Sequence, residues 1–479
     1  MEKKLLEEEN TNMDSRVSKT ISLKVKEIEG DTLTPITIFH RLQGKKKFLL
    51  ESSRKHENTG RYSFIGSDPY LELRAFGEEY EIHRILEKSR TRQKGQILEI
   101  MQQQLGVPDE VLPFPFFGGG VGYIGYDVIR QYENIGKIPS DEMEMPDTHL
   151  MFYEKVAILD HQLQKIYVVV LNLSGTVSDG QLQHELNLMA EQLLTPSTQE
   201  LTLEPVKVGA VTSNSSKETF TDMVKTAKEH IKKGDVFQVV LSQRLQAKME
   251  GNAFSFYRNL RRTNPSPYMF YIDFDDYLLL GASPESLVSV RDNQVFTNPI
   301  AGTRKRGLTE EEDCKLEEDL LSDEKELAEH RMLVDLGRND LGRVCEFGSV
   351  SLTKHLTVER YKHVMHIVSE VKGALRKDVS ALDALLSCLP AGTVSGAPKI
   401  RAMQLINELE PTKRGVYAGA VGYVNVTGNL DFALAIRTMV VKSQTAYVQA
   451  GAGIVLDSVP EQEYEETLQK ARALLEVKE

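Results

Sequence analysis

The stretch GGVGY at residues 119–123 returns almost unchanged as GAVGY at residues 419–423. Both copies place glycine within an apolar run, and glycine inside a strand usually marks a close backbone approach or a bulge. The repeat is compatible with two equivalent strands of one duplicated sheet. Two further apolar runs also predict strands, KIYVVVLNL (165–173) and DVFQVVLSQRLQAKM (235–249).

Three segments have apolar residues at helical spacing and predict helices. They are 179–194, 217–234 and the C-terminal 459–479. Ser216 is suited to begin the second helix because its hydroxyl can accept a hydrogen bond from a free backbone N–H. Gly234 is suited to end it.

The chain has 479 residues, which is more than one compact core usually holds. We therefore expect two domains or one large two-lobed unit. Residues 196–215 are rich in Ser, Thr and Pro and predict a linker between regions 18–195 and 216–475. The polar, acidic residues 1–17 predict a disordered tail.

Composition excludes several classes of protein. Hydrophobic residues make up 41% and charged residues 27%, as in an ordinary globular protein. The net charge of −12 argues against general nucleic-acid binding, which needs a basic face. An anionic small molecule remains compatible with the composition, because a local basic pocket can form in an acidic protein.

The cysteines and the apolar runs bear on the compartment. Cys314, Cys345 and Cys388 form no CxxC pair, so a zinc site or a disulfide framework is not expected. The charged N-terminus lacks the apolar core of a secretory signal. No apolar run reaches the roughly 20 residues of a membrane helix. We expect a cytoplasmic protein with no membrane partner.

Two glycine-rich segments resemble nucleotide-binding motifs without meeting their requirements. GVGYIG (120–125) matches GxGxxG but does not lead into a helix that opens with small residues. AGTVSGAPK (391–399) lacks the spacing of a P-loop. We expect no nucleotide cofactor.

Two pairs of glutamates could supply a metal site. Residues 309–336 predict an acidic helical region in which Glu326 and Glu329 share a face, and Glu463 and Glu466 repeat that spacing near the C-terminus. Carboxylates on two helices suit Mg²⁺, which binds a few protein oxygens and keeps positions for water and substrate. Spacing alone equally fits solvated acidic faces.

Three other features indicate an anion-binding site. Arg437 lies inside an apolar run, where a charge is usually paired or faces a ligand, and guanidinium can grip a carboxylate with two hydrogen bonds. The GAG turn at 451–453 offers backbone N–H groups to an anion. His366 lies on an apolar segment and, taken alone, fits a core histidine as well as a catalyst.

An ordered set of motifs resembles one known family. The motifs are FQVVLSQR (237–244), SPES (283–286), NPIAGTRKRG (298–307), DEKELAEHRMLVDLGRNDLGRV (323–344), VMHIVSEV (364–371), PAGTVSGAPK (390–399), YAGAVGYV (417–424), AIRTMV (435–440), QAGAGIV (449–455) and EYEET (463–467). Together they resemble the chorismate-utilising enzymes, and within that family the large subunits of anthranilate synthases. LLESS (49–53) and GRYSFIG (60–66) extend the resemblance toward the N-terminus.

The resemblance implies a fold and a site. It implies a two-subdomain α+β fold of large antiparallel sheets packed face to face, with helices outside. It implies Mg²⁺ bound by Glu329 and Glu466, with Glu326 and Glu463 beside them. It assigns substrate contacts to Gly302, Thr303, Thr393, Tyr417, Arg437, Gly451, Ala452, Gly453 and Lys470. Catalysis falls to Glu285 as a candidate general acid, His366 in proton transfer and pyruvate elimination, and Thr303 beside the ring.

Two positions distinguish the branches of the family. The resemblance implies that aminodeoxychorismate synthases carry a nucleophilic lysine where this chain has Ala301. It implies that isochorismate and salicylate synthases carry a water-activating lysine where this chain has Gln238. An alanine is no nucleophile and a neutral amide is no base. External ammonia therefore remains as the nucleophile, which implies anthranilate and pyruvate as products.

The same resemblance implies partners and regulation. No glutaminase signature surrounds the cysteines, so ammonia is expected from a separate glutamine amidotransferase subunit (component II). LLESS and NPSPYMF (264–270) resemble the halves of a feedback site for L-tryptophan, with Glu51, Ser52, Pro267, Tyr268 and Met269 as its residues. Two alternatives stay open: an aminodeoxychorismate synthase component I, and an inactive tryptophan-binding paralogue.

Overall fold

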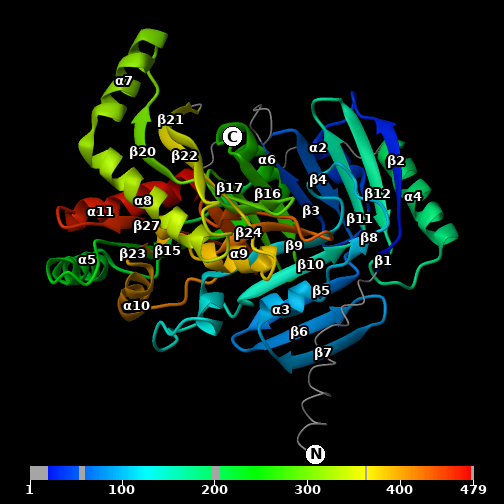
Figure 1. The fold of residues 1–479 in the computed structure, drawn as a ribbon, viewed down its shortest axis with the longest axis horizontal. Coiled ribbons are helices and arrows are strands. Elements are labelled where there is room, and N and C mark those ends of the chain that lie inside the picture. Colours follow the sequence, from blue (N-terminus) through cyan, green and yellow to red (C-terminus); the bar gives the residue numbers. More distant parts are fainter. Residues whose placement is uncertain (1–19, 53–59, 197–204, 362–363, 476–479) are drawn as a thin grey trace, which may run out of the picture.

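Two large sheets dominate the computed structural model, which describes residues 20–52, 60–196, 205–361 and 364–475 (Figure 1). Sheet I contains, in spatial order, β20 (Ile300–Lys305), β22 (Val364–Ala374), β19 (Gln294–Thr297), β18 (Ser286–Arg291), β25 (Leu430–Leu434), β24 (Ala420–Asn425), β9 (Gly119–Ile124), β10 (Thr148–Tyr153), β5 (Leu71–Phe76), β6 (Glu79–Arg84) and β7 (Ser89–Lys94), and β21 (Ser351–Arg360) also pairs with β22.

Sheet II is the second large sheet. Its order is β13 (Lys207–Val208), β15 (Gln238–Glu250), β27 (Thr445–Ile454), β26 (Thr438–Lys442), β17 (Tyr277–Ser283), β16 (Tyr268–Asp273), β3 (Phe48–Glu51), β4 (Tyr62–Gly66), β11 (Lys155–Asp160), β12 (Lys165–Leu171) and β2 (Leu23–Glu29), with β14 (Thr212–Ser213) and β23 (Gly396–Ala397) on β15. A separate parallel pair joins β1 (Thr20–Ile21) to β8 (Val107–Pro108). Every strand pair within the two large sheets is antiparallel over the described residues.

An aromatic core joins the two sheets face to face. Phe48 and Phe64 of sheet II are buried against residues of sheet I. The ring centroids of Phe48 and Tyr153 are 4.6 Å apart, and those of Phe64 and Tyr423 are 5.7 Å apart. Edge-on rings at these separations add attraction beyond the apolar area they bury. The predicted α+β fold with large antiparallel sheets is confirmed.

The repeated glycine segments lie side by side at the centre of sheet I. They form β9 and β24, and the register places Gly122 opposite Gly422. A Cβ atom on Gly422 would lie 2.1 Å from the Asp431 carbonyl oxygen, and one on Gly122 would lie 2.0 Å from the His149 carbonyl oxygen. Glycine is required at both positions because the neighbouring backbones leave no room for a side chain.

Helices cover the outer surfaces (Figure 1). They are α2 (Pro35–Arg41), α3 (Ile97–Gln102), α4 (Asp179–Leu194), α5 (Lys217–Lys232), α6 (Ala253–Thr263), α7 (Glu310–Ser322), α8 (Glu324–Gly342), α9 (Ala381–Cys388), α10 (Lys399–Leu409) and α11 (Pro460–Leu475), with short 3-10 turns η1 (Tyr126–Gln131) and η2 (Gly392–Val394). The Ser216 hydroxyl caps α5 by accepting from the Thr219 N–H at 3.2 Å, as predicted.

The acidic region predicted as helical forms two helices, not one. Asp323 has extended backbone angles between α7 and α8, so the first helix ends there. Its carboxylate then accepts hydrogen bonds from the N–H groups of Lys325 at 3.0 Å and Glu326 at 3.2 Å. This cap fixes the beginning of α8, the helix that carries one of the two glutamate pairs.

Both large sheets draw strands from each side of the predicted boundary at 196–215. Within that segment, β13 and β14 pair with β15. The division into regions 18–195 and 216–475 stays a prediction about chain organisation. Residues 1–17, predicted as a tail, lie outside the described residues. None of the described helices is both long and apolar enough to cross a membrane.

The glycine pair at the centre of sheet I generates the first prediction. We expect Gly422→Ala to lower the free energy of unfolding by about 3 kcal/mol or more, because the new methyl group collides with backbone that cannot move alone. Urea unfolding followed by circular dichroism measures it. The matched control is Gly180→Ala in α4, where no atom lies within 4 Å of the new carbon. An equal loss in both variants would contradict the argument.

Candidate active site

His366 faces the bulge in β20. The register between β20 and β22 shifts between Ala301 and Thr303, and Gly302 adopts a φ of 72°, which favours glycine. The bulge turns the Gly302 carbonyl oxygen toward His366 Nδ1 at 3.0 Å, and Thr303 Oγ1 lies 3.0 Å from the same nitrogen. A carbonyl only accepts, so Nδ1 carries a proton in this contact, and in a neutral ring Nε2 would be the basic nitrogen.

Arg304 holds the bulge against the acidic helices. Its guanidinium contacts Asp319 at 2.7 Å, Asp323 at 2.8 Å and Glu326 at 3.4 Å. Arg304 belongs to the motif at 298–307, but its role was not predicted from the sequence. The signal in the sequence that could have indicated this role was a basic residue two positions after Gly302. Ala301, the residue before that glycine, lies opposite Ile367 on β22.

Glu285 and Thr393 meet beside a small cavity. The Thr393 hydroxyl donates to Glu285 Oε1 at 2.9 Å, and both residues line a cavity of about 40 Å³. Burial raises the pKa of Glu285 to about 7, and the hydrogen bond from Thr393 lowers it in part. A carboxyl group with a pKa near 7 can donate a proton at neutral pH. The structure thus brings these two predicted residues together.

The GAG segment at 451–453, predicted as a turn, is instead part of strand β27, because it pairs with β15. Tyr417 and Gln238 lie against its glycines. A Cβ on Gly451 would lie 2.6 Å from the Tyr417 hydroxyl, and one on Gly453 would lie 2.6 Å from Gln238 Nε2. Ala452, between them, is buried. Small residues are therefore needed here so that both polar side chains can reach the strand.

The glutamate pair on α8 is partly buried. Burial, followed by the charge of Glu329, raises the pKa of Glu326, while Arg304 lowers it. Two carboxylates this close repel each other, and a bound cation would relieve that repulsion.

The glutamate pair on α11 resembles the one on α8. Burial and the charge of Glu466 raise the pKa of Glu463, against a hydrogen bond with Ser458. The charge of Lys325 on α8 lowers the pKa of Glu463, so α8 and α11 lie near one another. Lys470 pairs with Glu466 at 2.7 Å and donates to the Gly451 carbonyl at 3.0 Å. Lys470 therefore connects α11 to the glycines of β27.

The four glutamates fit Mg²⁺ in their donor chemistry. All supply carboxylate oxygens, which Mg²⁺ prefers, and each pair contains one carboxyl group whose pKa is raised by its neighbour. No three potential ligands converge on one point among the described residues.

Arg437 directly precedes β26 and has an unusual backbone conformation. Its φ of 47° lies in the left-handed region, which a residue with a side chain rarely adopts outside constrained sites. Arg437 is exposed to solvent, yet neighbouring protein atoms desolvate its guanidinium and lower its pKa. No carboxylate among the described residues pairs with it. A guanidinium without a carboxylate partner can bind a carboxylate with two hydrogen bonds, and the role of Arg437 stays a prediction.

The five predicted inhibitor residues line one pocket between the sheets, with a volume of about 1080 Å³. Glu51 on β3 pairs directly with Met269 on β16. Its carboxylate accepts from the Tyr257 hydroxyl and from Arg261 Nε, each at 2.7 Å. Ser52, Pro267 and Tyr268 complete the predicted set along the same wall.

A bridge across this pocket was not anticipated from the sequence. The Tyr268 hydroxyl on sheet II donates to Asp431 on sheet I at 3.0 Å. Arg291 pairs with the other oxygen of Asp431 at 3.1 Å. Strand alternation alone could not have shown that these residues face one another, because they belong to different sheets.

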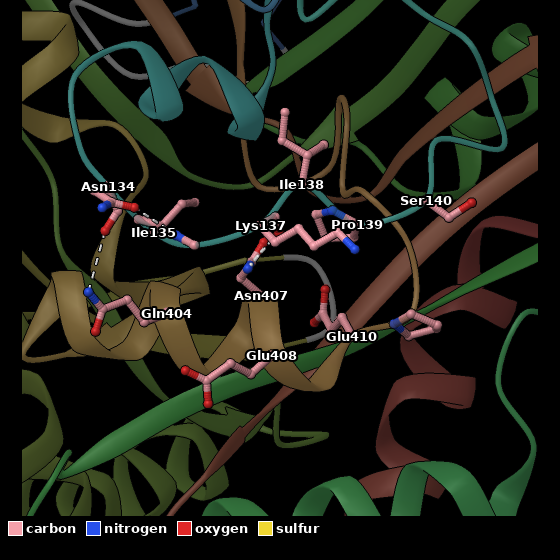
Figure 2. A pocket seen from close by; sticks show the side chains of 12 residues that line it. Asn134, Ile135, Lys137, Ile138, Pro139, Ser140, Gln404, Asn407, Glu408 and Glu410 are labelled. Atoms are coloured by element: carbon pink, nitrogen blue, oxygen red, sulfur yellow. Dashed lines mark hydrogen bonds between the residues drawn. The ribbon is translucent and has the colours of Figure 1, made fainter.

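A second surface hollow lies apart from the predicted residues. Figure 2 shows it between residues 134–140 and α10. Its volume is about 690 Å³. Gln404 donates to the Asn134 carbonyl at 3.4 Å across it. None of the predicted site residues lines it.

A family model described as chorismate binding enzyme matches residues 45–476. The chain belongs to the chorismate-binding enzyme family. The resemblance drawn from the motifs is confirmed, and with it the prediction of a chorismate-utilising enzyme. The roles of individual site residues stay predictions.

Known relatives agree with this assignment. The chain is 48% identical to anthranilate synthase component 1 of Lactococcus lactis, over 95% of this chain and 99% of the relative. It is 49% identical to that of Aquifex aeolicus, over 94% and 93%. The crystal structure of anthranilate synthase component I from Streptococcus pneumoniae matches with a TM-score of 0.81 and 45% identity, over 94% and 98% of the two chains. A menaquinone-specific isochorismate synthase from Escherichia coli, 21% identical with a TM-score of 0.71, shares the fold.

The pKa of Glu285 can be measured directly. We expect an infrared band of a protonated carboxyl group that is present at about pH 5, half lost near pH 7 and absent at about pH 9, because burial disfavours the carboxylate. The difference from Glu285→Gln identifies the band. Thr393→Val should move the titration to higher pH, since the carboxylate loses its hydrogen-bond donor. A band already lost at about pH 5 would refute the assignment.

Proposed function

We propose that this chain is the large subunit of a cytoplasmic anthranilate synthase, which converts chorismate and ammonia to anthranilate and pyruvate in the first step of tryptophan biosynthesis. The observation that carries the proposal is the absence of an amine at two positions. Ala301 and Gln238 stand where the resemblance implies lysine in the other branches of the family. Relatives covering nearly the whole chain bear the name anthranilate synthase component 1, which supports the same branch.

Chorismate carries two carboxylates, and this chain offers cationic and backbone groups to hold them. Arg437 would grip one through two hydrogen bonds. The backbone N–H groups from Gly451 to Gly453, Tyr417 and Lys470 would contact the enolpyruvyl carboxylate and its surroundings. Holding both carboxylates fixes the ring relative to the reacting groups, which is a large part of catalysis.

Two side chains would then move protons. Glu285, partly protonated at neutral pH, would donate to the C4 hydroxyl as it leaves. His366 would exchange a proton through Nε2 during pyruvate elimination and aromatisation, while the Gly302 carbonyl holds its Nδ1 proton. Thr303 would line the ring beside it. Glu285, between β17 and β18, and His366, on β22, would act at different ring positions.

Magnesium would be held by Glu329 and Glu466, with Glu326 and Glu463 in contact directly or through water. Bound there, it would polarise the conjugated ring through the ring carboxylate. Arg304 and Lys470 would keep the glutamates in place and limit their repulsion.

Ammonia would attack C2 in the space beside Ala301. A small apolar residue neither competes as a nucleophile nor binds ammonium. The name component 1 supports a second component, and we propose a glutamine amidotransferase subunit (component II) as the source of ammonia.

We also propose that L-tryptophan inhibits the enzyme from the pocket lined by Glu51, Ser52, Pro267, Tyr268 and Met269. The pocket is just above the roughly 300–1,000 Å³ typical of small-molecule sites. Inhibition requires that tryptophan bind an inactive arrangement better than the active one.

The proposal predicts anthranilate fluorescence from the purified chain with chorismate, Mg²⁺ and ammonium, without a partner. L-tryptophan should suppress the signal. Ser52→Phe should raise the tryptophan concentration needed for that suppression by roughly tenfold or more, since the phenyl ring would occupy the pocket. The same variant should retain activity without tryptophan.

Other products would favour the alternatives. Accumulation of 4-amino-4-deoxychorismate without pyruvate would identify an aminodeoxychorismate synthase. Tryptophan binding by calorimetry, with chorismate unconsumed even after addition of the glutaminase subunit, would identify an inactive paralogue.

The metal assignment predicts that Glu466 on α11 and Glu329 on α8 are needed for activity, whereas the adjacent Glu465 is not. Glu466→Gln and Glu329→Gln should each lower kcat/KM by roughly a hundredfold or more and raise the Mg²⁺ concentration needed for half activity. Glu465→Gln is the matched control, because Glu465 pairs with Lys217 at 3.4 Å on the exposed side of the helix. Loss of activity in the control alone, or an unchanged Mg²⁺ requirement in the first two, would contradict the assignment.

A further inference from the structure

Arg414 is a buried charge that the proposed reaction does not use. Its guanidinium donates to both oxygens of Glu410, from Nε at 2.8 Å and from Nη2 at 2.6 Å. Both side chains are almost completely buried. A buried ion pair is weak evidence for stability, since replacing both partners by apolar groups is often neutral. Its presence here therefore calls for another reason.

The remaining hydrogen bonds of Arg414 run to two segments of the proposed site. Nη1 donates to the Val394 carbonyl at 2.7 Å, and Nη2 donates to the Val240 carbonyl at 2.8 Å. Val394 directly follows Thr393, whose hydroxyl contacts Glu285. Val240 lies two residues after Gln238 and pairs with Gly453 of β27. One planar cation thus joins η2 to β15.

A third segment is fixed by ring contacts. The guanidinium carbon lies 5.5 Å from the centre of the Tyr417 ring and 4.9 Å from that of Tyr126. A cation held over an aromatic face stabilises the position of the ring. Glu410 extends the network further, since its Oε1 accepts from the N–H and the hydroxyl of Ser242, each at 2.8 Å. Ser242 lies opposite Gly451 on β27.

We propose that Arg414, oriented by Glu410, is a positioning residue of the chorismate site. It holds Thr393, Tyr417 and the Gln238 end of β15 in one arrangement without touching the substrate. Lysine cannot replace it, because a single ammonium cannot donate to Glu410, Val394 and Val240 in the geometry of a planar fork. This inference rests on the proposed function for its kinetic consequences, and on the contacts alone for its structural ones.

Kinetics provide the first test. We expect Arg414→Lys to fold and to lower kcat for anthranilate formation by roughly tenfold to a hundredfold, because small displacements of positioned groups are costly. The KM for chorismate should rise less than kcat falls. Lys413→Gln is the matched control: it removes neighbouring partly buried contacts to Asp147 at 2.8 Å and Asp141 at 3.1 Å that do not reach the site. A similar loss of thermal stability in both variants with unchanged kinetics in both would overturn the proposal.

The infrared titration of Glu285 tests the same idea without turnover. If Arg414 acts through Val394 and Thr393, Arg414→Lys should raise the pKa of Glu285 in the same direction as Thr393→Val. The double variant should then add little to Thr393→Val alone. Asp340, the acidic group in the same cavity, is paired with Lys399 at 2.7 Å and is unchanged in all variants. An unshifted titration in Arg414→Lys would overturn the inference.

The two readouts separate the possible failures. If the wild-type chain does not convert chorismate, the proposed function fails, while the titration still decides the role of Arg414. Should Arg414→Lys not fold, Glu410→Gln takes its place, since an amide keeps one acceptor for Arg414 and loses the other. Glu410→Gln should shift the titration in the same direction by less, and no shift would contradict the proposal.

Discussion

The close contact of β9 and β24 is the constraint on which the rest of the structure depends. Gly122 and Gly422 let these strands, from opposite ends of the chain, pair at the centre of sheet I. The next strand, β25, takes its place from β24, and the Leu434 N–H at its end donates to the Glu285 carbonyl at 3.0 Å. The candidate acid is therefore positioned by the sheet centre. A substitution that separates β9 from β24 would therefore displace Glu285 as well as disturb the packing of the sheet, even if it lies far from Glu285.

Glu72 and Glu285 show that burial and neighbouring groups together decide how a buried carboxyl group ionises. Burial raises the pKa of Glu72, but hydrogen bonds and charges from His149 and Lys46 outweigh it and hold that pKa well below the usual range. Glu285 has a hydroxyl as its hydrogen-bond partner and no cation acts on its pKa, so burial prevails and the pKa rises to about 7. The contrast separates a structural carboxylate from one suited to donate a proton. The charge of Arg414, paired with Glu410, does not shift the pKa of Glu285 directly.

Local features of the fold could be predicted from the sequence, and long-range ones could not. The helices 179–194 and 217–232 follow from apolar spacing and from a serine cap, both of which depend on neighbours in the chain. The break at Asp323 was missed because its cap depends on one backbone conformation within an unbroken acidic pattern. Residue roles came from ordered motifs, not from periodicity. Arg414 was overlooked because a charge after Pro411 in a polar segment has the pattern of an exposed turn, and only the folded chain shows it buried.

The pocket between the sheets and the candidate active site share their walls, which would give the proposed regulation a physical basis. Pro284 and Ser286, on either side of Glu285, line the pocket, as does Ile300 beside Ala301. The Tyr268–Asp431 hydrogen bond crosses from sheet II to β25, the strand that holds the Glu285 backbone. A ligand in the pocket has a differential effect only if these contacts differ between two arrangements of the sheets. Because packed cores are bistable more readily than they deform continuously, a small shift of β25 against β16 would move the acid away from Thr393 as a unit. On this view inhibition needs no contact between tryptophan and chorismate, since both would depend on the same strand.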